Sequence, residues 1–194
     1  MSDSTRQRLI HKAHDLIYRQ GFHAVGLDRL LEEVGVTKTT FYNHFQSKDD
    51  LVHEVLRWHD RWWRDTFQQL LRKHGGDTPR GQILSLVDAL EEVLSDDQFN
   101  GCFFINVAVQ FPLPHDPAHQ AAAEHKRAME DLVRQIAGYA GARDPAAVAQ
   151  EISLLMEGMY VRRQVLRDPG TPEAARRLLA SIVERHLPGE RMHH

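Results

Sequence analysis

A short run of polar residues near position 40 has the types and spacing needed to read the edges of base pairs. Five polar residues share one face of a possible helix: Lys38, Thr39, Thr40, Asn43 and His44. Phe41 and Phe45 lie four residues apart on the opposite face, where they can pack inward. Hydrogen-bond donors and methyl groups on short side chains suit the major groove of DNA. This segment therefore indicates a helix that binds DNA.

Two neighbouring residues could hold the DNA backbone. Tyr42 is an aromatic residue among polar ones, and Lys48 begins the next predicted helix. A lysine beside the amide groups of a helix N-terminus can clamp a phosphate. Ordinary helical bundles also contain a glycine turn followed by a helix, so periodicity alone leaves DNA binding and simple packing as alternatives.

Two short helices joined by a tight turn must position this polar face. The spacing predicts them over about 27–34 and 38–44, separated by Gly35, which can adopt a left-handed turn conformation, and with Thr37 as the cap of the second. An earlier helix is predicted between a cap at Ser4 and a stop at Gly21. These three helices form a predicted DNA-binding domain over residues 1–47.

Helical periodicity also dominates residues 48–194, which we expect to form a larger regulatory and dimerisation domain. Breaks at glycine and proline separate six further predicted helices: 48–73, 79–94, 103–110, 117–139, 146–166 and 172–187. No stretch alternates with the two-residue period of a strand. The sequence therefore predicts an all-α protein of about nine helices, with an N-terminal helix-turn-helix domain.

The composition is that of a globular protein, with 42% hydrophobic and 26% charged residues. The formal net charge is −3, so any affinity for nucleic acid must come from a local patch. Cys102 is the single cysteine, which excludes an internal disulfide and fits a reducing cytoplasm. The N-terminus lacks the apolar core of a signal peptide, and no apolar run approaches the ~20 residues of a membrane span. We expect a cytoplasmic protein with no membrane partner.

Residues of about 6–53 resemble the DNA-binding region of the tetracycline-repressor (TetR) family. The matching elements are Tyr18-Arg19-Gln20-Gly21-Phe22, Leu27-Asp28-Arg29-Leu30-Leu31, Val34-Gly35-Val36-Thr37 and Phe41-Tyr42-Asn43-His44-Phe45-Gln46-Ser47-Lys48-Asp49-Asp50-Leu51. Two positions depart from the family pattern. Gly26 replaces the usual serine or threonine cap, and Leu31 replaces a common small residue, which affects packing more than function.

The resemblance implies a role for each residue of the motif. In the family the third helix enters the major groove, so Lys38 and Thr39 become candidates for contacts with bases. Groove or phosphate contacts are implied for Thr37, Thr40, Tyr42 and His44. Lys48 corresponds to a lysine that holds a phosphate. The implied partner is double-stranded operator DNA.

A second motif, Gly101-Cys102-Phe103-Phe104-Ile105-Asn106 followed by Gln110-Phe111-Pro112, resembles the regulatory domain of one subgroup. In such proteins a pocket within the helical bundle of each subunit binds a small molecule. Apolar and aromatic residues with a few polar groups supply suitable walls. The candidates are Trp62, Trp63, Phe67, Phe103, Phe104, Asn106, Gln110, Met156 and Tyr160. The alternative for each of them is simple core packing.

The last two predicted helices carry apolar stripes that could pair two subunits. Their members are Ile152, Leu155, Met159, Leu178, Leu179, Ile182 and Val183. A monomer would bury the same residues internally, which is the alternative. A homodimer is favoured because a single helix-turn-helix reads few bases, whereas a dimer reads two half-sites ~34 Å or more apart.

These patterns predict a dimeric repressor that binds a palindromic operator and is released by an unidentified small-molecule inducer. No phosphate loop, nucleophile elbow or metalloprotease motif is present, so we expect no enzyme, no catalytic residue and no cofactor. His11 and His14 are expected on the exposed side of the first helix, and no metal site is predicted. The alternatives are a ligand-independent regulator or activator, and a helical interaction protein without DNA binding.

Overall fold

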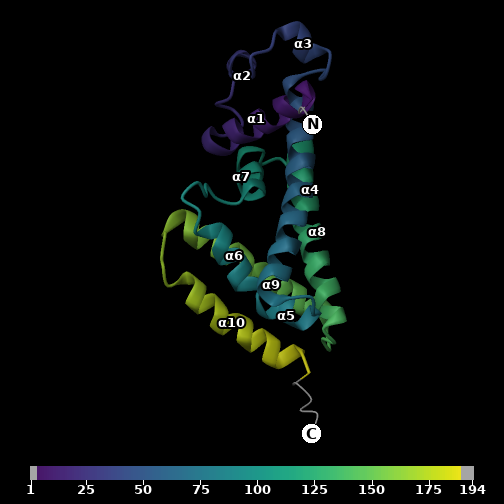
Figure 1. Cartoon of the computed structure of the whole chain (residues 1–194), viewed down its shortest axis with the longest axis vertical. Coiled ribbons are helices and arrows are strands. Elements are labelled where there is room, and N and C mark those ends of the chain that lie inside the picture. Colours follow the sequence, from purple (N-terminus) through teal and green to yellow (C-terminus); the bar gives the residue numbers. More distant parts are fainter. Residues whose placement is uncertain (1–3, 189–194) are drawn as a thin grey trace. The chain divides into compact units, whose positions relative to one another are not determined.

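The computed structural model describes residues 4–188, which form ten helices and no strand (Figure 1). In chain order these are α1 (Thr5–Gln20), α2 (Leu27–Val34), α3 (Lys38–Tyr42), α4 (Lys48–Gly75), α5 (Pro79–Leu84), α6 (Leu86–Leu94), α7 (Phe103–Gln110), α8 (Pro117–Tyr139), α9 (Pro145–Val165) and α10 (Thr171–His186). The predicted all-α fold is confirmed. Within the described range, none of the helices has the length and apolar character of a membrane span.

α1 and α2 begin and end where local signals predict, and α3 begins as predicted but ends at Tyr42, two residues before the predicted end. The Ser4 hydroxyl accepts the Gln7 backbone N–H at 3.3 Å, and the Gln7 side chain accepts the Ser4 N–H at 3.2 Å, which is a reciprocal capping box. Gly35 ends α2 in the left-handed conformation, with φ at +73°. Thr37 caps α3 by accepting the Thr40 N–H at 3.2 Å.

The chain forms two compact units, each built from two separate stretches of sequence. Unit 1 comprises Met1–Trp63 and Cys102–His125, and unit 2 comprises Arg64–Gly101 and Lys126–His194, as far as these ranges are described. Unit 1 therefore contains α1 to α3 and α7, together with parts of α4 and α8. The expected functional boundary between residues 47 and 48 lies within unit 1 and stays a prediction.

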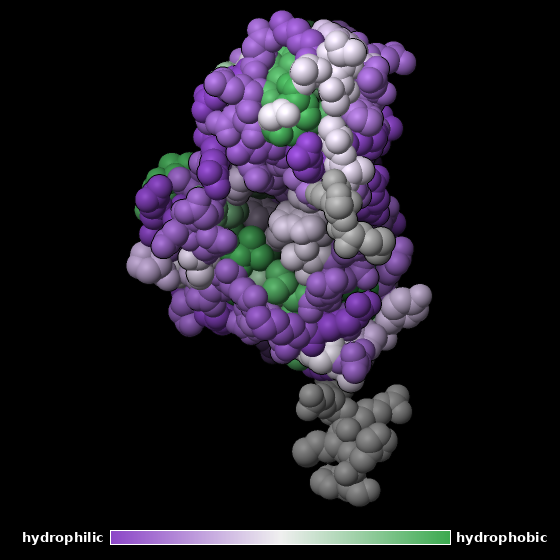
Figure 2. Space-filling model, turned by 45° about the horizontal axis from the view of Figure 1, so that its top comes forward, coloured by the Kyte–Doolittle hydropathy of each residue, from purple (hydrophilic) through white to green (hydrophobic). Residues whose placement is uncertain are grey.

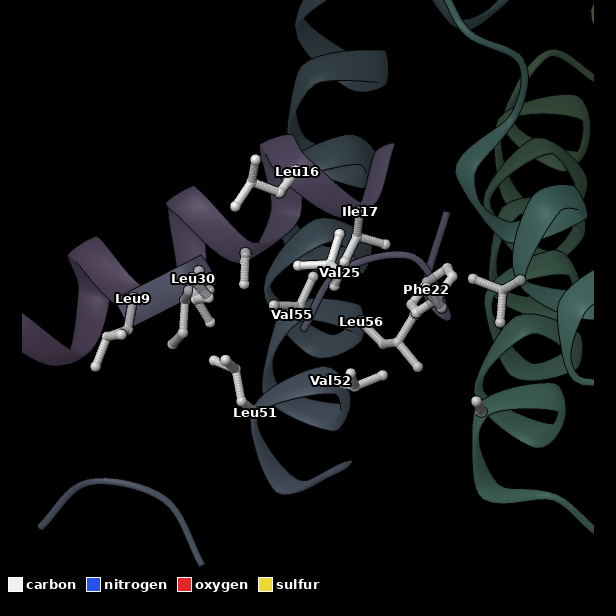
Figure 3. Packing of buried hydrophobic residues seen from close by; sticks show 14 of the residues in the cluster. Leu9, Leu16, Ile17, Phe22, Val25, Leu30, Leu51, Val52, Val55 and Leu56 are labelled. Atoms are coloured by element: carbon white, nitrogen blue, oxygen red, sulfur yellow. The ribbon is translucent and has the colours of Figure 1, made fainter. Parts of the chain in front are cut away.

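The core of unit 1 packs α1 and α2 against the first half of α4 (Figure 3). Leu9 and Ile17 of α1, Leu30 of α2, and Leu51 and Val55 of α4 are all buried in this cluster. Each such side chain contributes roughly 1.5–3 kcal/mol by leaving water. The packed helices α1, α2 and α4 therefore form the core that supports α3.

Unit 2 is organised around α9 and α10, which pack along each other, and α10 also packs on α5 and α6. Arg176 of α10 donates to Asp88 of α6 at 2.8 and 2.9 Å. Arg163 of α9 donates to the backbone oxygen of Leu94 at 2.5 Å.

On the face drawn in Figure 2, hydrophilic residues cover most of the surface, and hydrophobic ones are confined to a few patches.

The helix predicted over 79–94 is in fact two helices, α5 and α6, which meet at Ser85. The Ser85 hydroxyl lies 3.3 Å from the backbone oxygen of Leu71 in α4. At Gly81 an added Cβ would lie only 2.1 Å from the backbone oxygen of Gly75, so α5 touches the end of α4 backbone to backbone. Contact with α4 explains the break, and it is why ten helices replace the predicted nine.

The apolar stripes predicted to join two subunits are corrected by the structure. Five of the seven residues are buried inside unit 2: Ile152, Met159, Leu179, Ile182 and Val183. They are covered because α9, α10 and α6 pack on one another within the chain. Leu178 of α10, one of the seven, is exposed, and it forms an exposed stripe with Leu154, Val161 and Val165 of α9, which were not in the predicted set. We call these four residues the exposed α9–α10 stripe.

Candidate nucleic-acid interface

The short helix α3 buries its aromatic face and exposes its polar face. Phe41 and Phe45 lie in the core of unit 1, with their ring centroids 5.4 Å apart. Tyr42, between them in the sequence, is 56% exposed, and Lys38 and Thr39 are exposed as well. The two phenylalanines thus anchor α3, while its polar side chains stay open to a partner.

The structure places the seven predicted DNA-contacting residues around α3 and at the start of α4. Five of them are exposed: Thr37, Lys38, Thr39, Tyr42 and His44. Thr40 and Lys48 are half-buried. The hydroxyls of Thr37 and Thr40 lie 3.0 Å apart, so this pair also fixes the first turn of α3. Contact of these residues with DNA stays a prediction.

Lys38, the first residue of α3, forms an exposed ion pair with Asp28 of α2, with Nζ 2.8 Å from Oδ1. This hydrogen bond and the charge of Asp28 raise the pKa of Lys38 above its ordinary value, which keeps it a cation. Lysine donates to the O6 and N7 atoms of guanine, and aspartate accepts from the N4 amine of cytosine. The pair is therefore chemically complementary to the major-groove edge of a G·C base pair.

Lys48 stands at the N-terminus of α4, whose first turn is capped by two local hydrogen bonds. The Ser47 hydroxyl accepts the Asp50 N–H at 3.1 Å, and the Asp50 carboxylate accepts the Gln46 N–H at 2.9 Å. The ammonium group of Lys48 donates to the backbone oxygen of Phe22 at 3.1 Å. Its charge is thereby held next to the turn that joins α1 to α2.

Arg6 is a candidate that the sequence reasoning missed. Its guanidinium lies 5.2 Å from the centroid of the Phe45 ring and 2.5 Å from the Glu54 carboxylate. Glu54 also pairs with Arg57 at 3.1 Å. These contacts place a cation next to the segment that follows α3, where it could add a phosphate contact. The available signal was a basic residue in the first turn of α1.

The nine candidates for ligand binding are divided between the two units. Unit 1 holds Trp62, Trp63, Phe103, Phe104, Asn106 and Gln110, and unit 2 holds Phe67, Met156 and Tyr160. Trp62, a predicted pocket wall, is 43% exposed and stacks on Trp58 with centroids 5.8 Å apart. The ring of Tyr160 stacks on Phe99 at 6.3 Å, with the ammonium of Lys126 5.6 Å from its centroid.

A buried layer of histidines in unit 1 contradicts the expected exposure of His14. The side chain of His14 is only 11% exposed, and its Nε2 shares a hydrogen bond of 2.9 Å with Nδ1 of His59 in α4. On the neighbouring helix α8, His125 bonds the carboxylate of Asp60 at 2.7 Å. The expectation was wrong because α4 covers this side of α1, which the periodicity of α1 alone does not reveal.

Burial disfavours the protonated form of two of these histidines, His59 and His14. The His59 ring stacks on Phe103 of α7, with centroids 4.3 Å apart. Burial lowers the pKa of His59 well below its ordinary value, and the nearby charges of His14 and His125 lower it further. Burial also lowers the pKa of His14, although Asp15 opposes this shift. Among residues 4–188, no three metal-ligating side chains gather into a set that could hold a metal ion.

Comparison with family models matches two ranges that together cover most of the chain. Residues 9–55 match the model of the bacterial regulatory proteins of the tetR family. Residues 79–179 match the model of the tetracyclin repressor-like C-terminal domain. The first range contains α2 and α3, and the second contains α7.

Individual relatives extend over nearly the whole length. The HTH-type transcriptional regulator YjdC of Escherichia coli strain K12 is 26% identical over 178 residues, which is 92% of this chain and 93% of the relative. The crystal structure of SCO4454, a TetR-family transcriptional regulator from Streptomyces coelicolor, superimposes with a TM-score of 0.83 at 28% identity, covering 93% of this chain and 95% of that one. The reduced form of E. coli NemR, at 22% identity and a TM-score of 0.82, shares the fold.

Proposed function

Because the chain belongs to the TetR family, whose members are DNA-binding transcription regulators rather than enzymes, we propose that it is a dimeric, ligand-responsive repressor. It binds a palindromic operator in the bacterial cytoplasm and leaves the operator when a small-molecule inducer binds. The observation that carries the proposal is the exposed polar face of α3 above its two buried phenylalanines.

Selection from a pool of randomised DNA duplexes tests the DNA-binding part. The full chain should enrich one inverted repeat, because a two-fold dimer presents two copies of α3 to two half-sites. Each half-site should contain a G·C pair where Lys38 and Asp28 meet the base edges. Enrichment of no duplex would contradict the proposal, and a single unrepeated site would contradict the dimeric mode.

The exposed α9–α10 stripe supports dimerisation. Leu154, Val161 and Val165 recur on one side of α9, and Leu178 is 58% exposed on α10, which packs along α9. An apolar stripe on two adjacent helices can pair with its own copy across a two-fold axis. The same two helices that pack the interior of unit 2 thus offer a second face to a partner subunit.

Leu178→Arg should convert the dimer to a monomer. In the dimer the two introduced guanidinium groups would lie near the two-fold axis, where they would be desolvated without a counter-charge and would weaken association. In the monomer the site is exposed to solvent, so arginine should not affect folding. Sedimentation equilibrium should give a mass of 22.3 kDa, half that of the wild-type protein. Val109→Arg, at an exposed apolar residue of unit 1, is the control and should remain dimeric. If the Leu178→Arg protein were still a dimer, the exposed α9–α10 stripe would not be the dimer interface.

The inducer is proposed to contact residues from the predicted ligand-binding set. The candidates in unit 1 are Trp62, Trp63, Phe103, Phe104 and Asn106, and those in unit 2 are Phe67, Met156 and Tyr160; the two groups are tested separately. Gln110 is set apart because its side chain already bonds Phe22 and Asn106. Compounds that raise the melting temperature of the chain would be screened for release of the selected duplex. To shift a 1:99 population to 99:1, such a compound must bind the released state ~5.5 kcal/mol more tightly. A ligand that binds without changing operator affinity would contradict induction.

A further inference from the structure

The turn between α1 and α2 is held from both sides at Phe22. Its backbone N–H donates to Oε1 of Gln110, at the end of α7, over 2.7 Å. Its backbone oxygen accepts the ammonium of Lys48, at the start of α4, over 3.1 Å. These two backbone groups lie on either side of one Cα atom, so the two bonds together fix the peptide units before and after it.

Side chains of α7 and its end reinforce this hold on Phe22. The buried Phe22 ring lies 5.6 Å from Phe103 and 5.3 Å from Phe111, measured between centroids. The ring of His23 hydrogen-bonds the backbone oxygen of Gln110 at 3.2 Å. The turn leading into α2 is thus packed directly on α7, although about ninety residues separate them in the sequence.

Both polar atoms of the Gln110 side chain are engaged in this arrangement. Oε1 accepts the Phe22 N–H, and Nε2 donates to the Asn106 backbone oxygen within α7 at 3.3 Å. Gly21 is required here for two reasons. Its φ is +89°, and an added Cβ would lie 2.8 Å from Oε1 of Gln110. The partners of Gln110 indicate that it serves the turn rather than a bound ligand.

We propose that Gln110 is a positioning residue for DNA binding: it fixes the backbone N–H of Phe22 and so steadies the backbone whose carbonyl aims the Lys48 ammonium at an operator phosphate. This inference rests on the proposed function. An ammonium group carries three donors, so Lys48 can keep its bond to Phe22 while donating to a phosphate. Without the Gln110 acceptor, the ring contacts of Phe22 and the bond of His23 remain, but the Phe22 backbone and the Lys48 ammonium are held less firmly.

A double-mutant cycle on the selected duplex tests the proposal. Gln110→Leu keeps the size of the side chain but removes its acceptor, and it should weaken operator binding about tenfold. The slope of log affinity against log salt concentration (the salt slope) should decrease in magnitude by about one. Lys48→Ala should have a similar effect. Because both substitutions remove the same phosphate contact, the double variant should bind no more than about two- to threefold more weakly than Lys48→Ala. If Gln110 only stabilised the fold, Gln110→Leu would leave the salt slope unchanged. If the losses of binding free energy in the two single variants added up in the double variant, the proposal would be overturned.

Two variants and a direct readout complete the experiment. Gln110→Glu retains an acceptor for the Phe22 N–H and should keep most of the affinity and the full salt slope, whereas Gln120→Leu, at an exposed glutamine of unit 1, should change neither. Amide hydrogen exchange at Phe22, followed by NMR, should accelerate at least about tenfold in Gln110→Leu. Unchanged exchange would show that the bond is not formed and overturn the proposal. Failure of the wild-type chain to select any duplex would contradict the proposed function, and this inference with it.

Discussion

Replacing Tyr42 and Lys48 together with alanine should lower operator affinity about a hundredfold at physiological salt, with little change in the fold. Tyr42 is exposed on α3 and Lys48 stands at the start of α4, and each is proposed to contact a phosphate. Only Lys48 carries a charge, so the slope of log affinity against log salt should fall by about one, while loss of the Tyr42 contact lowers the affinity at every salt concentration. Fluorescence anisotropy with the selected duplex, repeated over a salt series, measures both quantities.

The matched control replaces an exposed tyrosine and lysine elsewhere. Tyr139→Ala with Lys73→Ala alters the same residue types in unit 2, where no DNA contact is proposed, and should leave the affinity unchanged. Circular dichroism and melting temperature verify that both double variants are folded. If the Tyr42 and Lys48 variant bound the duplex as well as the control, the interface would lie elsewhere on the chain.

Lowering the pH from about 7.5 to about 5.5 should destabilise unit 1, by at most about 1.4 kcal/mol for each of two buried histidines, because the unfolded chain takes up protons that the folded chain resists. Burial lowers the folded-state pKa of both His59 and His14 below their ordinary value of 6.5. The unfolded chain therefore binds protons first as the pH falls. The stability from these two groups is complete above pH 6.5 and is lost from there down through their lowered pKa.

Charges around the pair set the size of this effect. The carboxylate of Asp15 lies 3.2 Å from Nδ1 of His14 and favours protonation of His14. His59 has His14 as its hydrogen-bond partner and lies near His125, which is paired with Asp60, and both histidines disfavour protonation of His59. His59 is the more deeply buried partner, so it should contribute the larger part. If both His14 and His59 were protonated, two cations would face each other across the 2.9 Å that now separates Nε2 of His14 from Nδ1 of His59, and their hydrogen bond would be lost.

Urea unfolding at each pH measures the effect, and His59→Asn isolates it. Asparagine keeps a polar atom near the position of Nδ1 but does not titrate, so the variant should be less stable at neutral pH and lose about 1 kcal/mol less on acidification. His115→Asn, at an exposed histidine, is the control and should retain the wild-type pH dependence. A His59→Asn protein with the full acid loss would assign that loss to other groups.

Features that depend on near neighbours in the sequence could be predicted well. The Ser4 capping box, the left-handed Gly35 and the Thr37 cap involve residues within four positions of each other, so residue type alone indicates them. The inward face of α3 was also predictable, because Phe41 and Phe45 are the large apolar residues of that segment. The location of the candidate interface follows from these local rules.

Features that depend on distant contacts could not be predicted. Periodicity shows that α9 and α10 carry apolar stripes, but not whether the same chain or a partner covers them, and Ile152 and Leu179 are covered by the same chain. The break at Ser85 follows from contact with α4, and the burial of His14 follows from its bond to His59. The bond between Gln110 and Phe22 joins residues 88 positions apart, so no local pattern indicates it, and the place of Gln110 in a pocket wall stays a prediction.

The division of unit 1 between two stretches of sequence has a consequence for synthesis on the ribosome. Residues up to Trp63 leave the exit tunnel long before Cys102–His125, which complete the same unit. A newly made DNA-binding segment therefore emerges with Phe22 and His59 still lacking their α7 neighbours. Because α7 supplies Phe103, Phe104 and Val107 to the core of unit 1, that core can be completed only after translation has passed α7.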